Sequence, residues 1–129
     1  MNQIQLNKQR KENWRKYHIP GQPACRPLKI NSFQAAANNS DEHEHAKLAV
    51  CLQIKRLGHQ FITEAAKNRR ETIGLERRVD VVDLDTGLEY EIETDSARAA
   101  RFKGSGAVVV LVERMNMDEI LEHSKNSVI

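Results

Sequence analysis

The clearest pattern of polar and apolar positions predicts an amphipathic helix that begins at Ser40. Acidic residues fill the first turn after Ser40, apolar residues recur at helical spacing over residues 48–57, and Lys55 and Arg56 stand in the last turn. A serine suits the N-cap, acidic groups favour the positive end of the helix dipole, and Gly58 is a typical C-terminal stop. We therefore predict a helix over residues 40–57 with one buried face.

Three segments after this helix have the composition of strands. Residues 61–63, 79–84 and 89–94 are rich in β-favouring residues, and residues 85–87 give a turn signal between the second and third segments. We predict a short strand, a polar connection over residues 67–78 and then a β-hairpin.

The remaining segments complete an α/β pattern. Residues 96–102 favour a short helix, and residues 107–112 are apolar on both faces, which is typical of a central strand. The 12 residues of 95–106 suit a parallel crossover, and a capping box at Asn116 predicts a final helix. The predicted order is helix, three strands, helix, strand, helix.

Composition limits the class of protein. A chain of 129 residues is about one domain, and its 40% hydrophobic and 29% charged residues are typical of a compact fold. The longest apolar run, residues 107–112, is too short to span a bilayer, and we predict neither export nor membrane association. Two cysteines do not make a secreted disulfide scaffold, so we expect free thiols and a cytoplasmic protein.

Positive charge is concentrated at the N-terminus. Residues 1–31 carry seven Lys or Arg against one Glu, which leaves a net charge of −4 on the rest of a chain whose total is +2. We divide the chain into a basic N-terminal arm or extension, residues 1–39, and an α/β domain, residues 40–129. A basic arm can neutralise phosphates, and it can equally be a solvated tail. Trp14 and Tyr17 favour an ordered or binding arm. The candidate phosphate contacts are Lys8, Arg10, Lys11, Arg15 and Lys16.

The third predicted strand has an unusual acidic face. Glu89, Glu91 and Glu93 alternate with Tyr90 and Ile92, so the three carboxylates share one side. Like charges on one face repel and add nothing to a structural sheet. One interpretation is an edge strand with a solvated acidic face, and the other is a functional site.

The preceding strand strengthens the functional interpretation. A loop of two or four residues would pair Leu84 with Glu89, Val82 with Glu91 and Asp80 with Glu93. Asp80 would then share a face with Glu91 and Glu93, with paired residues about 5 Å apart. Such oxygen ligands favour Mg²⁺ or Mn²⁺.

The segment Arg78-Val79-Asp80, a hairpin, and Tyr90-Glu91-Ile92-Glu93-Thr94 together resemble the core of the PD-(D/E)XK nuclease superfamily, which has a restriction-endonuclease-like fold. The predicted order over residues 40–113 is similar to the αβββαβ core of that fold, a central mixed sheet flanked by helices. The resemblance implies that Asp80 and Glu91 bind the metal and that Glu44, or as second choice Glu42, is the additional acidic residue of the first helix.

Two positions depart from the family motif. Val79 stands where the motif has Pro, and Glu93 stands where the family usually has a Lys that helps to activate water or to stabilise charge. The resemblance therefore implies a variant in which Glu93 adds a ligand or accepts a proton, or in which a cation comes from the next helix. The candidate cations there, which could also grip phosphates, are Arg98, Arg101 and Lys103.

A zinc site has little support in the sequence. His43 and His45 are two positions apart, which splays their side chains on a helix, and no paired Cys or His spacing typical of zinc occurs. Cys51 falls on the apolar face of the predicted helix and is better interpreted as a core residue.

Three functions are consistent with these patterns. The first is a divalent-metal-dependent endonuclease that hydrolyses phosphodiester bonds, with DNA as its partner and, by analogy with small nucleases of this fold, a homodimeric state. The second is a non-catalytic nucleic-acid-binding protein derived from the nuclease fold, and the third is an interaction module with an exposed acidic strand.

Overall fold

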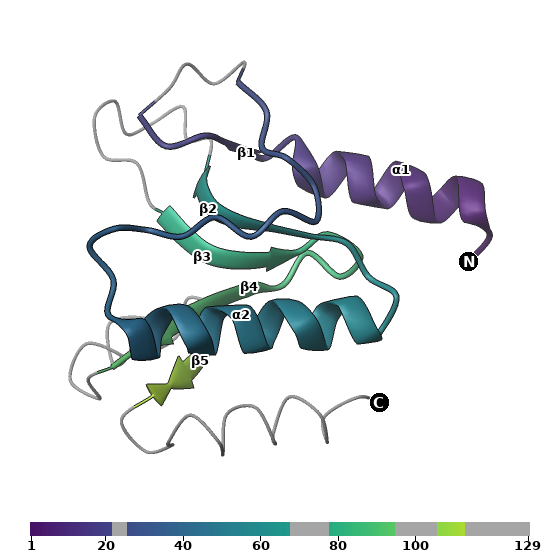
Figure 1. The fold of residues 1–129 in the computed structure, drawn as a ribbon. Coiled ribbons are helices and arrows are strands. Elements are labelled where there is room, and N and C mark those ends of the chain that lie inside the picture. Colours follow the sequence, from purple (N-terminus) through teal and green to yellow (C-terminus); the bar gives the residue numbers. More distant parts are fainter. Residues whose placement is uncertain (22–25, 68–77, 95–105, 113–129) are drawn as a thin grey trace.

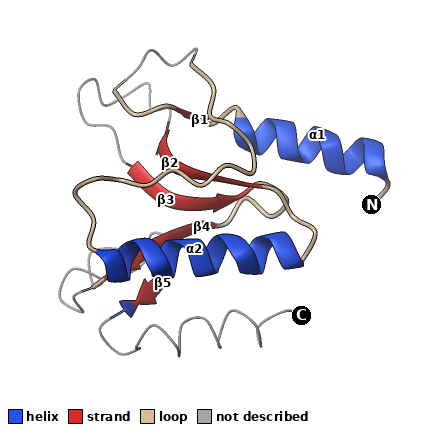
Figure 2. Cartoon of the chain, in the orientation of Figure 1, coloured by secondary structure: helices blue, strands red, loops and turns tan. Residues whose placement is uncertain are grey.

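The computed structural model describes residues 1–21, 26–67, 78–94 and 106–112. Strands β1 (Tyr17–His18), β2 (Phe61–Lys67), β3 (Arg78–Asp83), β4 (Glu89–Glu93) and β5 (Val108–Leu111) form one sheet in that order. Neighbouring strands from β1 to β4 are antiparallel, whereas β5 is parallel to β4. Helices α1 (Gln3–Trp14) and α2 (Asp41–Arg56) complete a mixed α/β fold (Figures 1 and 2).

Helix α2 has the ends that the sequence predicts. The Ser40 side chain accepts a hydrogen bond from the His43 N–H at 3.2 Å, and Asp41, Glu42 and Glu44 occupy the first turn. Gly58, with φ of +77°, donates to the Lys55 carbonyl, and His59 donates to the Ile54 carbonyl. This pair of bonds is a Schellman motif, which needs a left-handed residue that glycine adopts without strain.

Two hydrophobic clusters lie on opposite faces of the sheet. Helix α2 packs through Ala46, Val50 and Ile54 against a cluster that contains Val81 and Ile92, and Cys51 is also buried there. This burial confirms the interpretation of Cys51 as a core residue, and it raises the pKa of the thiol to about 12. The second cluster joins Trp14, Tyr17 and Leu28 to residues of β2 and β3.

The N-terminal segment packs on the domain. Asn13 of α1 donates to the Leu84 carbonyl at 2.8 Å, and Trp14 donates to the Leu28 carbonyl at 2.8 Å. Tyr17 pairs with Lys67 in the sheet, and its hydroxyl donates to Glu89 at 2.7 Å. The N-terminal segment is therefore an ordered helix followed by a short strand of the sheet, with Trp14 and Tyr17 as its apolar contacts.

The β3–β4 hairpin differs from the predicted register by two residues. Val82 pairs with Glu89 rather than with Glu91, and the Asp83 N–H donates to the Leu88 carbonyl. The turn begins at Asp83 rather than after Leu84, because the Asp83 side chain accepts hydrogen bonds from the N–H groups of Asp85 and Thr86, at 2.9 and 3.2 Å. The expected pairs Leu84–Glu89, Val82–Glu91 and Asp80–Glu93 are therefore wrong, although a shift of two keeps the same faces together.

One alternative interpretation and one expectation about strand position are also wrong. Strand β4 lies between β3 and β5, and Glu89 and Glu91 are buried, so it is not an edge strand with a solvated acidic face. Strand β5 ends the sheet formed by the described strands, and Val108 is 39% exposed, so it is not central. Apolar composition alone did not distinguish a central strand from an end strand. The predicted helices at residues 96–102 and after Asn116 lie outside the described residues.

Candidate functional site

The regular alternation of side chains between the two faces of the sheet is interrupted in β2 and β3, at positions that lie opposite each other. Ile62 and Ala65 are three residues apart, yet both belong to the cluster on the face away from α2, and the same holds for Val79 and Val82. Residues three apart in a regular strand face opposite sides. Because the ladder keeps one register across this point, Glu64 lies opposite Asp80.

Glu64 marks the distortion in the backbone. Its φ of +49° is left-handed, which costs a non-glycine residue about 1 kcal/mol or more. Both side chains at this point reach helix α2: Glu64 contacts Lys47, and Asp80 lies 3.5 Å from His43 Nε2. The distortion therefore brings two strand carboxylates to the first two turns of α2.

Lys47 is a buried ammonium at the centre of this site. Its Nζ lies 2.7 Å from Glu64 Oε1, 3.0 Å from Glu44 Oε2 and 2.8 Å from the Gln34 carbonyl oxygen. The side chain is fully buried, and its Nζ lies 4.9 Å from the centre of the Phe33 ring. Three acceptors match the three N–H donors of an ammonium, which is what makes a buried charge tolerable.

Glu44 is held by groups on both sides of the start of α2. Asn39 Nδ2 donates to Glu44 Oε1 at 2.7 Å, and the Ala36 N–H donates to Oε2 at 3.4 Å. Burial acts to raise the pKa of Glu44, but the hydrogen bonds from Asn39 and Lys47 outweigh it and lower the pKa below its usual value. Glu44 is therefore a carboxylate that stays ionised near neutral pH.

Asp80 lies where the β3–β4 ladder ends. Its Oδ2 accepts the Ile92 N–H at 2.7 Å, so its carboxylate takes the place of a backbone partner between the two strands. His43 Nδ1 is buried and has no hydrogen-bond partner among the described residues. Burial lowers the pKa of His43, but the nearby carboxylates of Asp80 and Glu44 outweigh this effect and raise it.

Two hollows open beside these side chains. The larger, of about 580 Å³, is bordered by Glu64 and Asp80 and also by the cationic residues Lys29 and Arg78. The smaller, of about 310 Å³, is lined by residues that include His43 and Glu93. Asn38 and Asn39 line both hollows, which are therefore neighbours at the N-terminal end of α2.

The predicted acidic residues are only partly brought together. Glu44 lies in the site, Glu42 is exposed, and Glu93 shares the smaller hollow with His43. Continuing the ladder by one pair places Glu91 across from Asp80. Tyr90 and Ile92 pack toward α2, however, so strand alternation directs the Glu91 side chain to the other face.

No ready-made metal cage exists in the described part of the chain. There, no three His, Cys, Asp or Glu side chains are grouped so as to hold a metal ion. The carboxylates of Asp80 and Glu91 are nevertheless hard oxygen donors, and proteins usually hold Mg²⁺ through one or two carboxylates together with substrate phosphates. The donor chemistry suits such an ion, but the Asp80 carboxylate reaches toward α2 whereas Glu91 is directed to the other face, so the two carboxylates do not converge in this structure.

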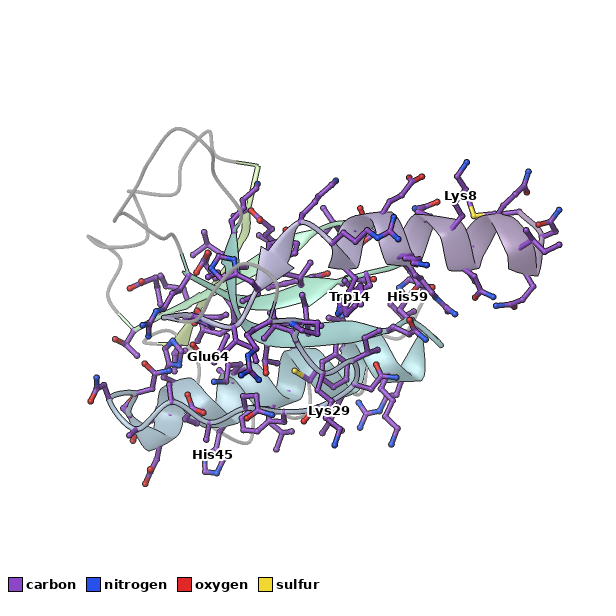
Figure 3. The ribbon with its side chains drawn as sticks, turned by 90° about the horizontal axis from the view of Figure 1, so that it is seen from above. Lys8, Trp14, Lys29, His45, His59 and Glu64 are labelled. Atoms are coloured by element: carbon purple, nitrogen blue, oxygen red, sulfur yellow. The ribbon has the colours of Figure 1, made fainter. Side chains whose placement is uncertain are left out.

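The predicted phosphate contacts have different surroundings. Lys8 and Lys11 are exposed on α1, and Lys8 stands on the part of the helix that extends away from the sheet (Figure 3). Arg10 instead contacts Asp85 and the Gly58 carbonyl, and Lys16 contacts Asn13. Arg15 is exposed. The other three candidates lie outside the described residues: Arg98, Arg101 and Lys103.

Lys47 and Glu64 were missed by the sequence patterns. For Lys47 a signal existed, because it precedes Val50, Cys51 and Ile54 by three, four and seven residues and so lies on the apolar face. A charged residue in an apolar stripe indicates a buried pair. Glu64 carried no such signal, because its role depends on a backbone turn inside a strand.

Comparisons with protein-family models, curated proteins and solved structures found no match for this chain. Neither helix in the described part of the chain has the length and apolar character needed to cross a membrane.

Proposed function

We propose that this chain is a divalent-metal-dependent nuclease that hydrolyses phosphodiester bonds in DNA. The observation that carries the proposal is the shared distortion at Glu64 and Asp80, which turns both side chains toward α2 beside an open hollow. Strained backbone and buried charges cost stability, and proteins keep such features mainly where a site needs them.

The element order supports the same proposal. Helix α2 is followed by the antiparallel strands β2, β3 and β4 and then by β5, which is parallel to β4. A restriction-endonuclease-like core has this order, with its acidic motif on the two strands of the hairpin. In this chain those strands are β3 and β4, which carry Asp80 and Glu91.

We infer Mg²⁺ or Mn²⁺ as the metal, with Asp80 as its ligand on the α2 side of the sheet. Glu91 is directed to the other face and would have to turn to the α2 side to join it. When bound, such an ion makes a coordinated water more acidic and offsets the negative charge of the phosphorane. Lys47 holds Glu44 and Glu64 in place by ion pairs, and it brings positive charge from α2 rather than from the β4 position that Glu93 occupies. Lys29 and Arg78 at the larger hollow can pair with backbone phosphates.

A cleavage assay tests this function. Full-length protein is incubated with duplex, single-stranded and branched DNA in Mg²⁺, Mn²⁺ or EDTA, and Asp80→Asn and Glu91→Gln are compared with Asp41→Asn. Asp41 is an exposed carboxylate in the first turn of α2, so its variant controls for lost charge. We expect metal-dependent cleavage that falls at least 100-fold in the first two variants, with DNA affinity unchanged or higher. Full cleavage in both variants would exclude these ligands.

A second candidate is a non-catalytic nucleic-acid-binding protein derived from the nuclease fold. It is favoured by the missing third metal ligand among the described residues and by the direction of Glu91 away from α2. This candidate predicts salt-sensitive DNA binding with no cleavage in any metal. The same assay therefore separates the two functions.

A further inference from the structure

The larger hollow combines three kinds of lining. Pro20, Pro27 and Leu28 and the alanines at 35–37 give it apolar walls. Gln34, Asn38 and Asn39 add side-chain amides, and charged groups of both signs border it. At about 580 Å³ it is in the size range of small-molecule sites, which are mostly apolar with a few polar groups that set orientation.

This lining differs from that of a surface that follows a duplex backbone. Phosphate tracking needs cations along a groove, whereas apolar walls gain free energy only from a group that leaves water. A nucleobase has two apolar faces and a polar edge, and amide side chains can match that edge because they both donate and accept hydrogen bonds. Lys29 is exposed at this hollow, where it can meet the phosphate of the same nucleotide.

We propose that this hollow binds an unpaired nucleobase, so that the substrate is a nucleic acid with a base outside the duplex: a single strand, a flap or a junction. This inference rests on the proposed nuclease function and narrows its substrate. Glu64 and Asp80 border the hollow, so a nucleotide held there has its phosphate near the carboxylate site. A paired base cannot enter without being unstacked, which costs a few kcal/mol and selects for bases that are already unpaired.

The protein carries its own reporter for this site. Trp14 is the single tryptophan, and its Nε1 donates to the carbonyl of Leu28, which lines the hollow. Figure 3 shows Trp14 at the end of α1 that meets the rest of the molecule. A ligand against Leu28 is expected to change Trp14 fluorescence.

The test titrates full-length protein in EDTA with deoxyadenosine 5′-monophosphate and with deoxyribose 5-phosphate, which lacks the base. Ala37→Leu narrows the hollow and Asn38→Ala removes an amide, while Asn7→Ala, on the exposed side of α1, is the matched control. We expect saturable binding of the nucleotide only, at least fivefold weaker in Ala37→Leu or Asn38→Ala and unchanged in Asn7→Ala. Thermal melting of each variant verifies that it is folded.

The outcomes separate this inference from the proposed function. Equal binding of the sugar phosphate, or no saturable nucleotide binding, overturns the base site even if metal-dependent cleavage is found. Base-dependent binding without cleavage in any metal keeps the base site and overturns the nuclease. A nuclease with this site should also cut a duplex with an unpaired flap at least tenfold faster than the same duplex without one, and equal rates would contradict the proposed substrate.

Discussion

Arg10 and Asp85 form a two-pronged ion pair between residues far apart in the chain. Arg10 Nε lies 2.9 Å from Asp85 Oδ1, and Nη2 lies 2.9 Å from Oδ2. The guanidinium also donates to the Gly58 carbonyl at 3.1 Å, so one side chain joins α1, the end of α2 and the β3–β4 turn. A residue of the basic N-terminal segment thus serves the fold.

Replacing this arginine is expected to destabilise the protein. Arg10→Ala leaves Asp85, whose side chain is only 7% exposed, without its charged partner. Hydrogen bonds to charged groups can contribute about 2 kcal/mol each, but solvent screens this partly exposed pair, so we expect a total loss of about 2 kcal/mol in urea denaturation. Lys11→Ala, at an exposed position of the same helix, should change stability by less than about 0.5 kcal/mol. Equal effects of the two variants would contradict this role of the pair.

The contribution of the Arg10–Asp85 pair to stability should depend on pH. Burial acts to raise the pKa of Asp85, but hydrogen bonds from Arg10 and the Gln60 N–H outweigh it and lower the pKa below the ordinary 3.8. A lowered folded-state pKa gives stability that is present above pH 3.8 and is lost as the pH falls through the folded-state value. The difference in unfolding free energy between wild type and Arg10→Ala should be constant from pH 5 to 7 and should narrow below pH 3.8. A difference that stays constant in acid would show that the pair contributes nothing by charge.

Two substitutions at Glu64 isolate the cost of its backbone conformation. Glu64→Gly and Glu64→Ala both remove one of the two carboxylate partners of Lys47, but only glycine adopts a φ of +49° without strain. We expect the glycine variant to be more stable than the alanine variant by about 1 kcal/mol in chemical denaturation. Ala65→Gly, one residue further along β2, should instead lower stability relative to wild type. If the unfolding free energy of Glu64→Ala equals or exceeds that of Glu64→Gly, the strand is not distorted at this residue.

Replacing Lys47 should destabilise the fold, and a second substitution at Glu64 should restore part of the lost stability. Lys47→Met leaves Glu44 and Glu64 facing each other without a cation, and we expect a loss of about 3 kcal/mol in unfolding free energy. Adding Glu64→Gln removes one of the two carboxylate charges and should recover part of the loss. Lys55→Met, at an exposed position of the same helix, is the control. An unfolding free energy within about 0.5 kcal/mol of wild type in Lys47→Met would mean that the cluster does not depend on its cation.

Exposed lysines of α1 provide a test of DNA contact that leaves the fold intact. If Lys8 and Lys11 meet phosphates, Lys8→Gln and Lys11→Gln should each reduce the slope of log affinity against log salt on duplex DNA by about 0.9. Lys55→Gln removes an equal charge from α2 and should leave the slope unchanged. Slopes are measured by fluorescence anisotropy over a range of salt concentrations. Unchanged slopes in both α1 variants would exclude helix α1 from the DNA interface.

Local signals predicted the elements whose ends are set locally. Helix α2 begins at the Ser40 cap and ends at Gly58, and both ends are fixed by hydrogen bonds within a few residues. The local sequence was therefore sufficient to predict where the helix begins and ends. The hairpin was also predicted, but its register was not, because the Asp83 side chain accepts hydrogen bonds from the Asp85 and Thr86 N–H groups. The strand pairing therefore ends two residues earlier in β3 than predicted. Turn chemistry of a single aspartate thus set the register, while the alternation of the strands was kept.

The site itself was predicted less well. Asp80, Glu44 and Glu93 were identified from residue type and spacing, and all three lie at the N-terminal end of α2. Lys47 and Glu64 were not identified, because their pairing depends on a left-handed residue inside β2 that only tertiary contacts can maintain. The predicted cluster of Asp80, Glu91 and Glu93 assumed regular alternation, which the distortion at Asp80 interrupts.

The docking of α1 also bears on the order of events during synthesis. The helix is made before its partners, since its hydrogen bonds from Arg10 and Asn13 need the later residues Gly58, Leu84 and Asp85. At roughly 5–20 residues per second, the ribosome makes that partner surface several seconds later. A polar helix of 12 residues is marginal on its own. Helix α1 must therefore acquire stable structure only after the end of α2 and the β3–β4 turn have been made, although it precedes both in the sequence.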